Sequence, residues 1–118
     1  MRELHALNAV VVIVANVLAA GWGFVYLRRG RTPGRLYAHM LALAQALVVA
    51  QVALGLLLLA GDTVSPGNLH PLYGVLALVA VLSPWFYAPP VPAKRLAWFA
   101  GAALVAAALS ARAYVTGT

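Results

Sequence analysis

The sequence predicts an all-α integral membrane protein, an up-down bundle of four transmembrane helices with both termini outside. Of its 118 residues, 64% are hydrophobic and only 8% are charged, which is more apolar than a soluble domain. Four apolar stretches each approach the ~20 residues that a helix needs to cross the hydrocarbon core. These spans are residues 4–27, 36–60, 69–88 and 96–115. The short connections favour antiparallel neighbours in a single domain, residues 1–118.

The first span is expected to be a retained helix and not a signal peptide. Its basic flank is only Arg2, offset by Glu3, and its apolar run exceeds the ~7–15 residues of a signal sequence. Small and polar residues recur on one face at intervals of three or four, which predicts that this face looks into the bundle. They are His5, Asn8, Val12, Asn16, Ala19 and Gly23.

The connections set the expected orientation. The first, RRGRTPGR (28–35), and the third, PPVPAKR (89–95), carry six of the eight basic residues, and only Arg2 and Arg112 lie on the opposite side. The positive-inside rule therefore predicts a multi-pass protein of the plasma (inner) membrane whose middle connection, 61–68, lies outside. The formal charge of +6 reflects this topology, so the lipid bilayer is an expected partner and nucleic acid is not.

The three later spans each carry a local packing signal. In the second, Gln51 lies deep in the span with Gly55 one turn further, which predicts an inward face. In the third, Pro84 lies one turn from the inner end and is expected to bend the helix. In the fourth, small residues recur every four positions and predict a close helix contact. These small residues are Ala102, Ala106 and Ser110.

The composition excludes several kinds of chemistry. The chain has no cysteine, which removes thiolate ligands, iron–sulfur clusters and covalently attached haem. Its two acids, Glu3 and Asp62, are expected at the edges of spans. A proton-coupled multidrug exporter needs a carboxylate near the membrane centre, so this class of protein is excluded. The sequence has neither a pair of carboxylates nor a nucleophile elbow, so nothing in it indicates a hydrolase. We assign no catalytic residue.

Two histidines carry the main functional expectation. His5 opens the first span and His70, in NLHPLYG (68–74), opens the third, so the two imidazoles should share one depth near the outer face. In an up-down bundle these helices stand on a diagonal of roughly 11–14 Å, which a metal with two axial imidazoles can bridge. Two histidines are too few for a bare ion, whereas haem supplies four further nitrogens. We therefore predict haem b with His5 and His70 as metal ligands.

Other residues are expected around this haem. Pro71 lets a helix begin directly after His70, and Gly74, one turn on, leaves a strip free of side chains for the porphyrin edge. Amide side chains can line the pocket, and outer arginines suit the propionates. These residues are Asn8 and Gln51, and Arg2 and Arg112. A simpler interpretation makes the histidines interfacial anchors and the arginines snorkelling side chains. His39, on the opposite side, is interpreted as such an anchor.

The surroundings of the two histidines resemble the haem A synthase family. QVALGLLLLAGDTVSPGNLHPLYGVLAL (51–78) has glutamine and glycine late in one span, a short outer loop and a histidine opening the next. RELHALNAVV (2–11) resembles the family's element of an acid followed by a histidine. The resemblance implies one four-helix half of an eight-span protein, with His5 and His70 as the axial pair and Glu3 near the acid used in substrate oxidation.

The sequence also departs from that family. Four spans represent at most one half and one haem site. Glu3 precedes His5 by two residues instead of three, Ala6 stands where the family usually has arginine, and the outer-loop cysteines of many members are missing. The resemblance therefore carries over a haem site and does not carry over catalysis.

Three functions stay open from the sequence. The first is a membrane b-type haem protein for electron transfer or haem handling, working as a homodimer or with a membrane redox partner. The second is a cofactor-free structural or assembly subunit of a respiratory membrane complex. The third is half of a split enzyme, active only with a second haem-bearing subunit.

Overall fold

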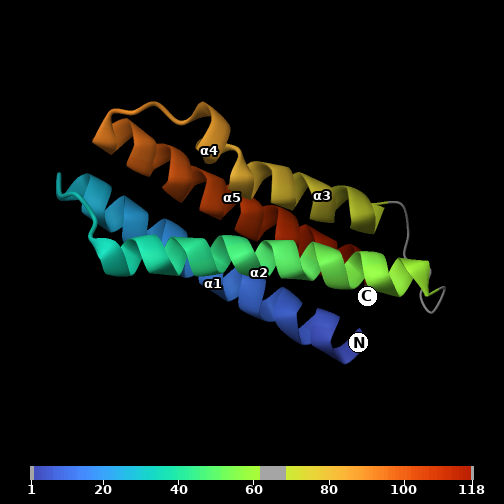
Figure 1. Ribbon diagram of the computed structural model, residues 1–118. Coiled ribbons are helices and arrows are strands. Elements are labelled where there is room, and N and C mark those ends of the chain that lie inside the picture. The colour runs from blue at the N-terminus through green and yellow to red at the C-terminus, as the bar shows by residue number, and fades with distance from the viewer. Residues whose placement is uncertain (1, 62–68, 118) are drawn as a thin grey trace.

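The computed structural model describes residues 2–61 and 69–117, and in these ranges the chain is helical, without strands (Figure 1). The helices are α1 (Arg2–Arg28), α2 (Arg35–Ala60), α3 (Leu69–Leu82), α4 (Pro84–Tyr87) and α5 (Pro92–Gly117). In the described chain four stretches are long and apolar enough to cross a membrane, with α3 and α4 together forming one. The all-α prediction is confirmed, and the chain has the helices of a multi-pass membrane protein. Most of the expected middle connection, residues 62–68, lies outside the described residues.

The helices α1, α2, α3 and α5 form a four-cornered bundle in which α1 and α3 stand at opposite corners. α1 contacts α2 and α5, and α3 contacts the same two helices, so α1 and α3 face each other across the bundle. Successive long helices run in opposite directions (Figure 1). We call the end where α1 and α3 begin the histidine end, after His5 and His70. The opposite end, where α1 stops at Arg28 and α5 begins at Pro92, is the basic end.

Small residues bring α1, α2 and α5 close together. A Cβ atom on Gly23 would lie 2.8 Å from Cβ of Ala100 on α5 and 2.7 Å from the hydroxyl oxygen of Tyr37 on α2. Helices in lipid associate mainly through such van der Waals packing, which small side chains allow. Much of the inward face predicted for α1 is buried, as expected: Val12, Asn16, Ala19 and Gly23.

The packed face of α5 differs from the one that the sequence suggested. Of the three predicted small residues, Ala106 is fully buried, but Ala102 and Ser110 are only partly buried. The most buried alanines of α5 are Ala100, Ala103, Ala106 and Ala107. Ala103 joins Ala15 and Ala19 of α1 in one apolar cluster. The close contact was predicted correctly, and its face on the helix was predicted in part, at Ala106.

The first connection begins with a left-handed glycine. Gly30 has φ of 64°, a conformation that costs glycine nothing and other residues a steric penalty. The Gly30 N–H donates to the Leu27 carbonyl at 3.2 Å, and the Arg31 N–H donates to the Tyr26 carbonyl at 3.0 Å. This pair of bonds is the Schellman motif, which satisfies the last carbonyls of a helix. It turns the chain sharply back towards α2.

The third span is interrupted where proline was expected to bend it. α3 ends at Leu82, and α4 starts at Pro84, which has no N–H to continue the helical ladder. The Ser83 hydroxyl donates to the Ala80 carbonyl at 2.8 Å. The single span predicted over 69–88 is therefore two helices, and α4 directs Trp85 to donate to the Gln45 side-chain oxygen of α2 at 3.0 Å. α5 begins at Pro92, four residues before the predicted span start at 96.

Two glycines of α1 provide a matched test of this packing. Gly23→Ala is expected to lower the free energy of unfolding by about 1–3 kcal/mol, because its Cβ would overlap Ala100 and Tyr37. Gly21→Ala is expected to leave stability unchanged or raise it, since a Cβ there meets no atom within 4 Å and alanine favours the helix. Thermal unfolding in detergent, followed by circular dichroism, measures both. Equal melting temperatures for the two variants would contradict the close contact at Gly23.

Candidate functional site

The two predicted histidines meet at the histidine end. His5 lies in the first turn of α1 and His70 in the first turn of α3, the two helices on the diagonal. Their ring centres are 5.9 Å apart and their planes are inclined at 79°. His39 is exposed, near the start of α2 at the basic end, and does not join them. The sequence therefore predicted correctly which two histidines come together.

His70 is oriented by a carbonyl of α5. Its Nδ1 lies 2.7 Å from the carbonyl oxygen of Ala113. A carbonyl oxygen only accepts, so Nδ1–H donates, and the lone pair of a neutral ring is then on Nε2. Metal-binding histidines commonly have this second hydrogen bond to a carbonyl. Pro71 lies in the first turn of α3, where its missing N–H costs no helical hydrogen bond. The sequence predicted that the helix begins directly after His70. In the structure it begins at Leu69, so His70 belongs to the helix.

His5 is held by close packing against α2. A Cβ atom on Gly55 would lie 3.2 Å from Cε1 of the His5 ring, so glycine makes room for the imidazole. The His5 Nδ1 atom is buried and has no hydrogen-bond partner in the described part of the chain. Buried polar atoms normally have a partner, so this atom marks a place where water or another group completes the site. Gly55 was predicted to face inward, but its contact with His5 was not foreseen.

Asn8 and Gln51 form a network beside His5. The Gln51 side-chain amide donates to the His5 carbonyl at 2.8 Å. The Asn8 amide donates to the Gln51 side-chain oxygen at 3.0 Å and to the Leu47 carbonyl at 3.2 Å. The two residues thus bind each other and join α1 to α2 within one turn of His5. Their donors fix the helices that hold the imidazole.

The remaining predicted site residues lie around the same end. The Arg112 guanidinium of α5 lies 5.6 Å from the centre of the Tyr73 ring of α3, a cation–π distance. Arg2 is exposed at the start of α1. A Cβ atom on Gly74 would meet no atom within 4 Å, so the space beside this residue is open. This open space on α3 therefore lies one helical turn after His70.

The spacing of the His5 and His70 rings is compatible with two imidazoles on one metal centre. Each metal–imidazole bond is about 2 Å and the ring centre lies roughly 1 Å further, so one iron between two imidazoles separates the ring centres by roughly 6 Å. The observed 5.9 Å is close to this value. No group of three or more His, Cys, Asp or Glu side chains within residues 2–61 and 69–117 gathers at one point. An ion here would need most of its ligands from elsewhere, and haem brings its own four nitrogens.

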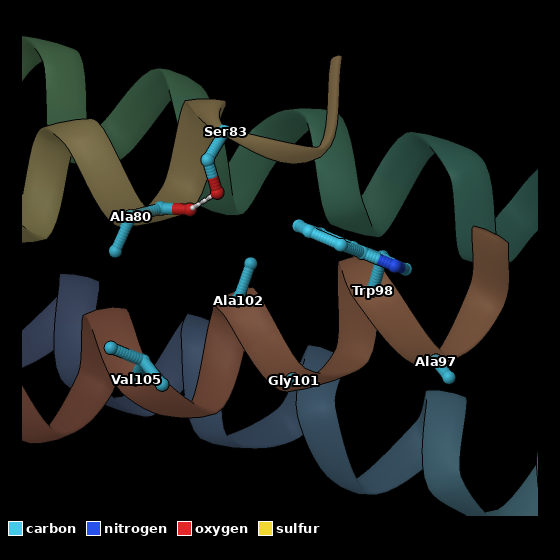
Figure 2. A pocket seen from close by; sticks show the side chains of 7 residues that line it. All are labelled: Ala80, Ser83, Ala97, Trp98, Gly101, Ala102 and Val105. Carbon is cyan, nitrogen blue, oxygen red and sulfur yellow. Dashed lines mark hydrogen bonds between the residues drawn. The ribbon is translucent and has the colours of Figure 1, made fainter. Parts of the chain in front are cut away.

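A separate groove lies between α3 and α5, away from the histidines. It has a volume of about 400 Å³ and is open to the surface. Figure 2 shows its walls, with Ala80 and Ser83 on one side and Trp98, Gly101 and Ala102 on the other. The Ser83 hydroxyl is already bonded to the Ala80 carbonyl (Figure 2). The groove has no ionisable side chain in its walls and resembles a packing surface more than a site for chemistry.

Comparison with known proteins identifies no relative of this chain. No protein-family model matches the chain, and no curated protein or solved structure matches it either. The resemblance to the haem A synthase family therefore stays a prediction from the sequence.

A double-mutant cycle tests the network beside His5. Asn8→Leu and Gln51→Leu each remove the hydrogen bond between the two side chains. We expect a coupling energy of about 0.6 kcal/mol, the average for side-chain hydrogen bonds between helices in membranes, and of at most about 1.7 kcal/mol. Reversible unfolding of the four proteins in mixed micelles gives the energies. Strictly additive effects would show that the two amides do not act together.

Proposed function

We propose that the chain is a membrane b-type haem protein, in which His5 and His70 are the two axial ligands, and that it transfers single electrons or handles haem. The observation that carries the proposal is the meeting of the His5 and His70 rings across the bundle diagonal, at 5.9 Å between centres. A haem held by two imidazoles supplies one-electron redox chemistry and has no open coordination position for a substrate. Electron transfer or haem handling therefore suits the site better than oxygen activation.

The chain's own residues would orient the two ligands by different means. The Ala113 carbonyl accepts from Nδ1 of His70, which directs the Nε2 lone pair of His70 away from that carbonyl. Gly55 gives His5 space, and Gln51 ties the His5 backbone to α2. The buried, unpaired Nδ1 of His5 is available to a water or to a group of the bound cofactor.

The charges support an orientation with the histidine end outside. Six of the eight basic residues lie in the two connections of the basic end, which the positive-inside rule assigns to the cytoplasm. We propose the plasma membrane, with haem near its outer face. Arg2 and Arg112 would then lie on the side of the haem propionates, which suit a guanidinium fork.

The haem A synthase resemblance adds a quaternary proposal. One four-helix chain corresponds to half of that family's eight spans, and two copies would supply two halves. Glu3 is exposed in the first turn of α1. It lies two residues before His5, whereas the acid of the haem A synthase family lies three residues before its histidine. We propose haem binding without the family's substrate oxidation, in a homodimer or beside a redox partner.

A cofactor-free subunit of a membrane complex is the second candidate. The observation that favours it is the open groove of small residues between α3 and α5, because small side chains let a neighbouring helix approach closely. In this case the histidines would be anchors at the membrane surface. The two candidates differ in colour, since only the first protein absorbs visible light.

The histidines provide the direct test of haem ligation. His5→Ala or His70→Ala is expected to abolish the low-spin, six-coordinate haem spectrum, because each removes one axial ligand. His39→Ala is the matched control and is expected to keep it, since His39 is exposed at the opposite end. Absorption and electron paramagnetic resonance spectra of the purified proteins measure this. An unaltered low-spin spectrum in His5→Ala contradicts the proposal, and a colourless wild-type protein from haem-replete cells favours the cofactor-free subunit.

Gly74 tests the position of the porphyrin. Gly74→Leu is expected to leave the melting temperature of the haem-free protein unchanged, because its Cβ meets no atom within 4 Å. The same change is expected to lower the haem content per chain, since leucine would occupy the space proposed for the porphyrin edge. Val75→Leu, at the next and exposed position, is the control. Full haem occupancy in Gly74→Leu would place the porphyrin elsewhere.

A further inference from the structure

A second hollow lies at the basic end, far from the histidines. It has a volume of about 170 Å³ and is bounded by the connection between α1 and α2 and by the start of α5. This is smaller than the ~300–1,000 Å³ typical of sites for drug-sized ligands. It therefore suits a small polar group and not a whole cofactor or nucleotide.

The walls of this hollow change from apolar to polar along the bundle. Leu27, in the last turn of α1, and Leu96, a buried residue of α5, form the side nearer the bundle. Arg31 and Thr32 form the side beyond the helix ends. Ala93 lies in the first turn of α5, so the positive end of that helix dipole is nearby. Such a gradient matches a lipid at the point where its headgroup meets its chains.

Within residues 2–61 and 69–117, no carboxylate neutralises the positive charge at this end. Six basic residues gather here: Arg28, Arg29, Arg31, Arg35, Lys94 and Arg95. Arg95 is engaged with aromatic rings, lying 5.8 Å from the Trp85 ring centre and 5.2 Å from that of Phe99. In the described part of the chain the only carboxylate side chain is that of Glu3, at the other end of the 27-residue α1. An anion from outside the chain is therefore the natural partner.

We propose that this hollow binds the phosphodiester headgroup of an anionic membrane phospholipid. Arg31 and Thr32 would donate to the phosphate, and the acyl chains would leave along the bundle beside Leu27 and Leu96. Lipid is favoured over a free phosphate because the apolar half of the hollow would be left exposed by an inorganic anion. This inference concerns the end opposite the proposed haem site, so it is tested on the protein whatever its haem content.

Diffuse attraction and a built site make different predictions. Each basic residue near an anionic surface strengthens binding about fivefold, whichever residue it is. A guanidinium that hydrogen-bonds a phosphate in a defined site contributes about tenfold or more. Arg31 lines the hollow and Arg29, two residues earlier, does not, although both carry the same charge.

Native mass spectrometry of the detergent-solubilised chain, titrated with phosphatidylglycerol or phosphatidylcholine, tests the site. The wild-type chain is expected to bind one phosphatidylglycerol more tightly than phosphatidylcholine. Arg31→Gln is expected to weaken that binding about tenfold or more, and Arg29→Gln about fivefold or less. Ala93→Leu, which fills the hollow without changing charge, should weaken it as well, while circular dichroism checks that all variants fold.

Three results would overturn the inference. Equal losses in Arg31→Gln and Arg29→Gln would mean diffuse attraction to the basic end. Unchanged binding in Ala93→Leu would place the lipid outside the hollow. Displacement of phosphatidylglycerol by millimolar inorganic phosphate would assign the site to a free anion and not to a lipid.

Discussion

The close approach of α1 to α2 and α5 at Gly23 is the contact on which the rest of the bundle depends. Helices are stiff and rise about 1.5 Å per residue, so fixing Gly23 against Ala100 also fixes what lies at the far ends of both helices. His5 is carried roughly 27 Å from Gly23 in this way, and Ala113 roughly 20 Å from Ala100. The contact among small residues near the basic end thus aligns α1 with α5, the helix whose Ala113 carbonyl accepts from His70.

The few polar side chains inside the bundle are used in two ways. Asn8 and Gln51 satisfy each other and hold α1 to α2, as apolar surroundings require of amides. Other buried polar atoms have no partner in the described chain. They are the side-chain oxygen of Asn16, the amide nitrogen of Gln45 and the hydroxyl of Tyr37. Buried polar atoms normally have a partner, so these positions, like Nδ1 of His5, mark places where water or another group completes the hydrogen bonding.

Hydropathy, the direction of the spans and the positions of proline were enough to predict the four helical stretches, a disturbance of the third at Pro84 and the pairing of His5 with His70; the bend expected at Pro84 is a full interruption of the helix. The rotation of each helix was less accessible. α5 is alanine-rich on several sides, so a spacing of small residues at Ala102 and Ala106 could not select the face that packs. The packed face of α5 is selected by its contacts with α1, α3 and α4 together. The contact of Gly55 with His5 likewise depends on how α1 and α2 are rotated about their axes. Haem, orientation and partners lie beyond what helix packing alone determines, because they require ligands and lipid.

The placement of Trp85 on α4, against Gln45 and Phe99, belongs to a wider asymmetry. All three tryptophans, Trp22, Trp85 and Trp98, lie in the half of the bundle away from the histidine pair. Intrinsic ultraviolet emission therefore originates at one pole of the molecule, and any visible chromophore between the imidazoles would absorb at the other. Tryptophan emission can therefore report on the basic end of the bundle without any attached dye.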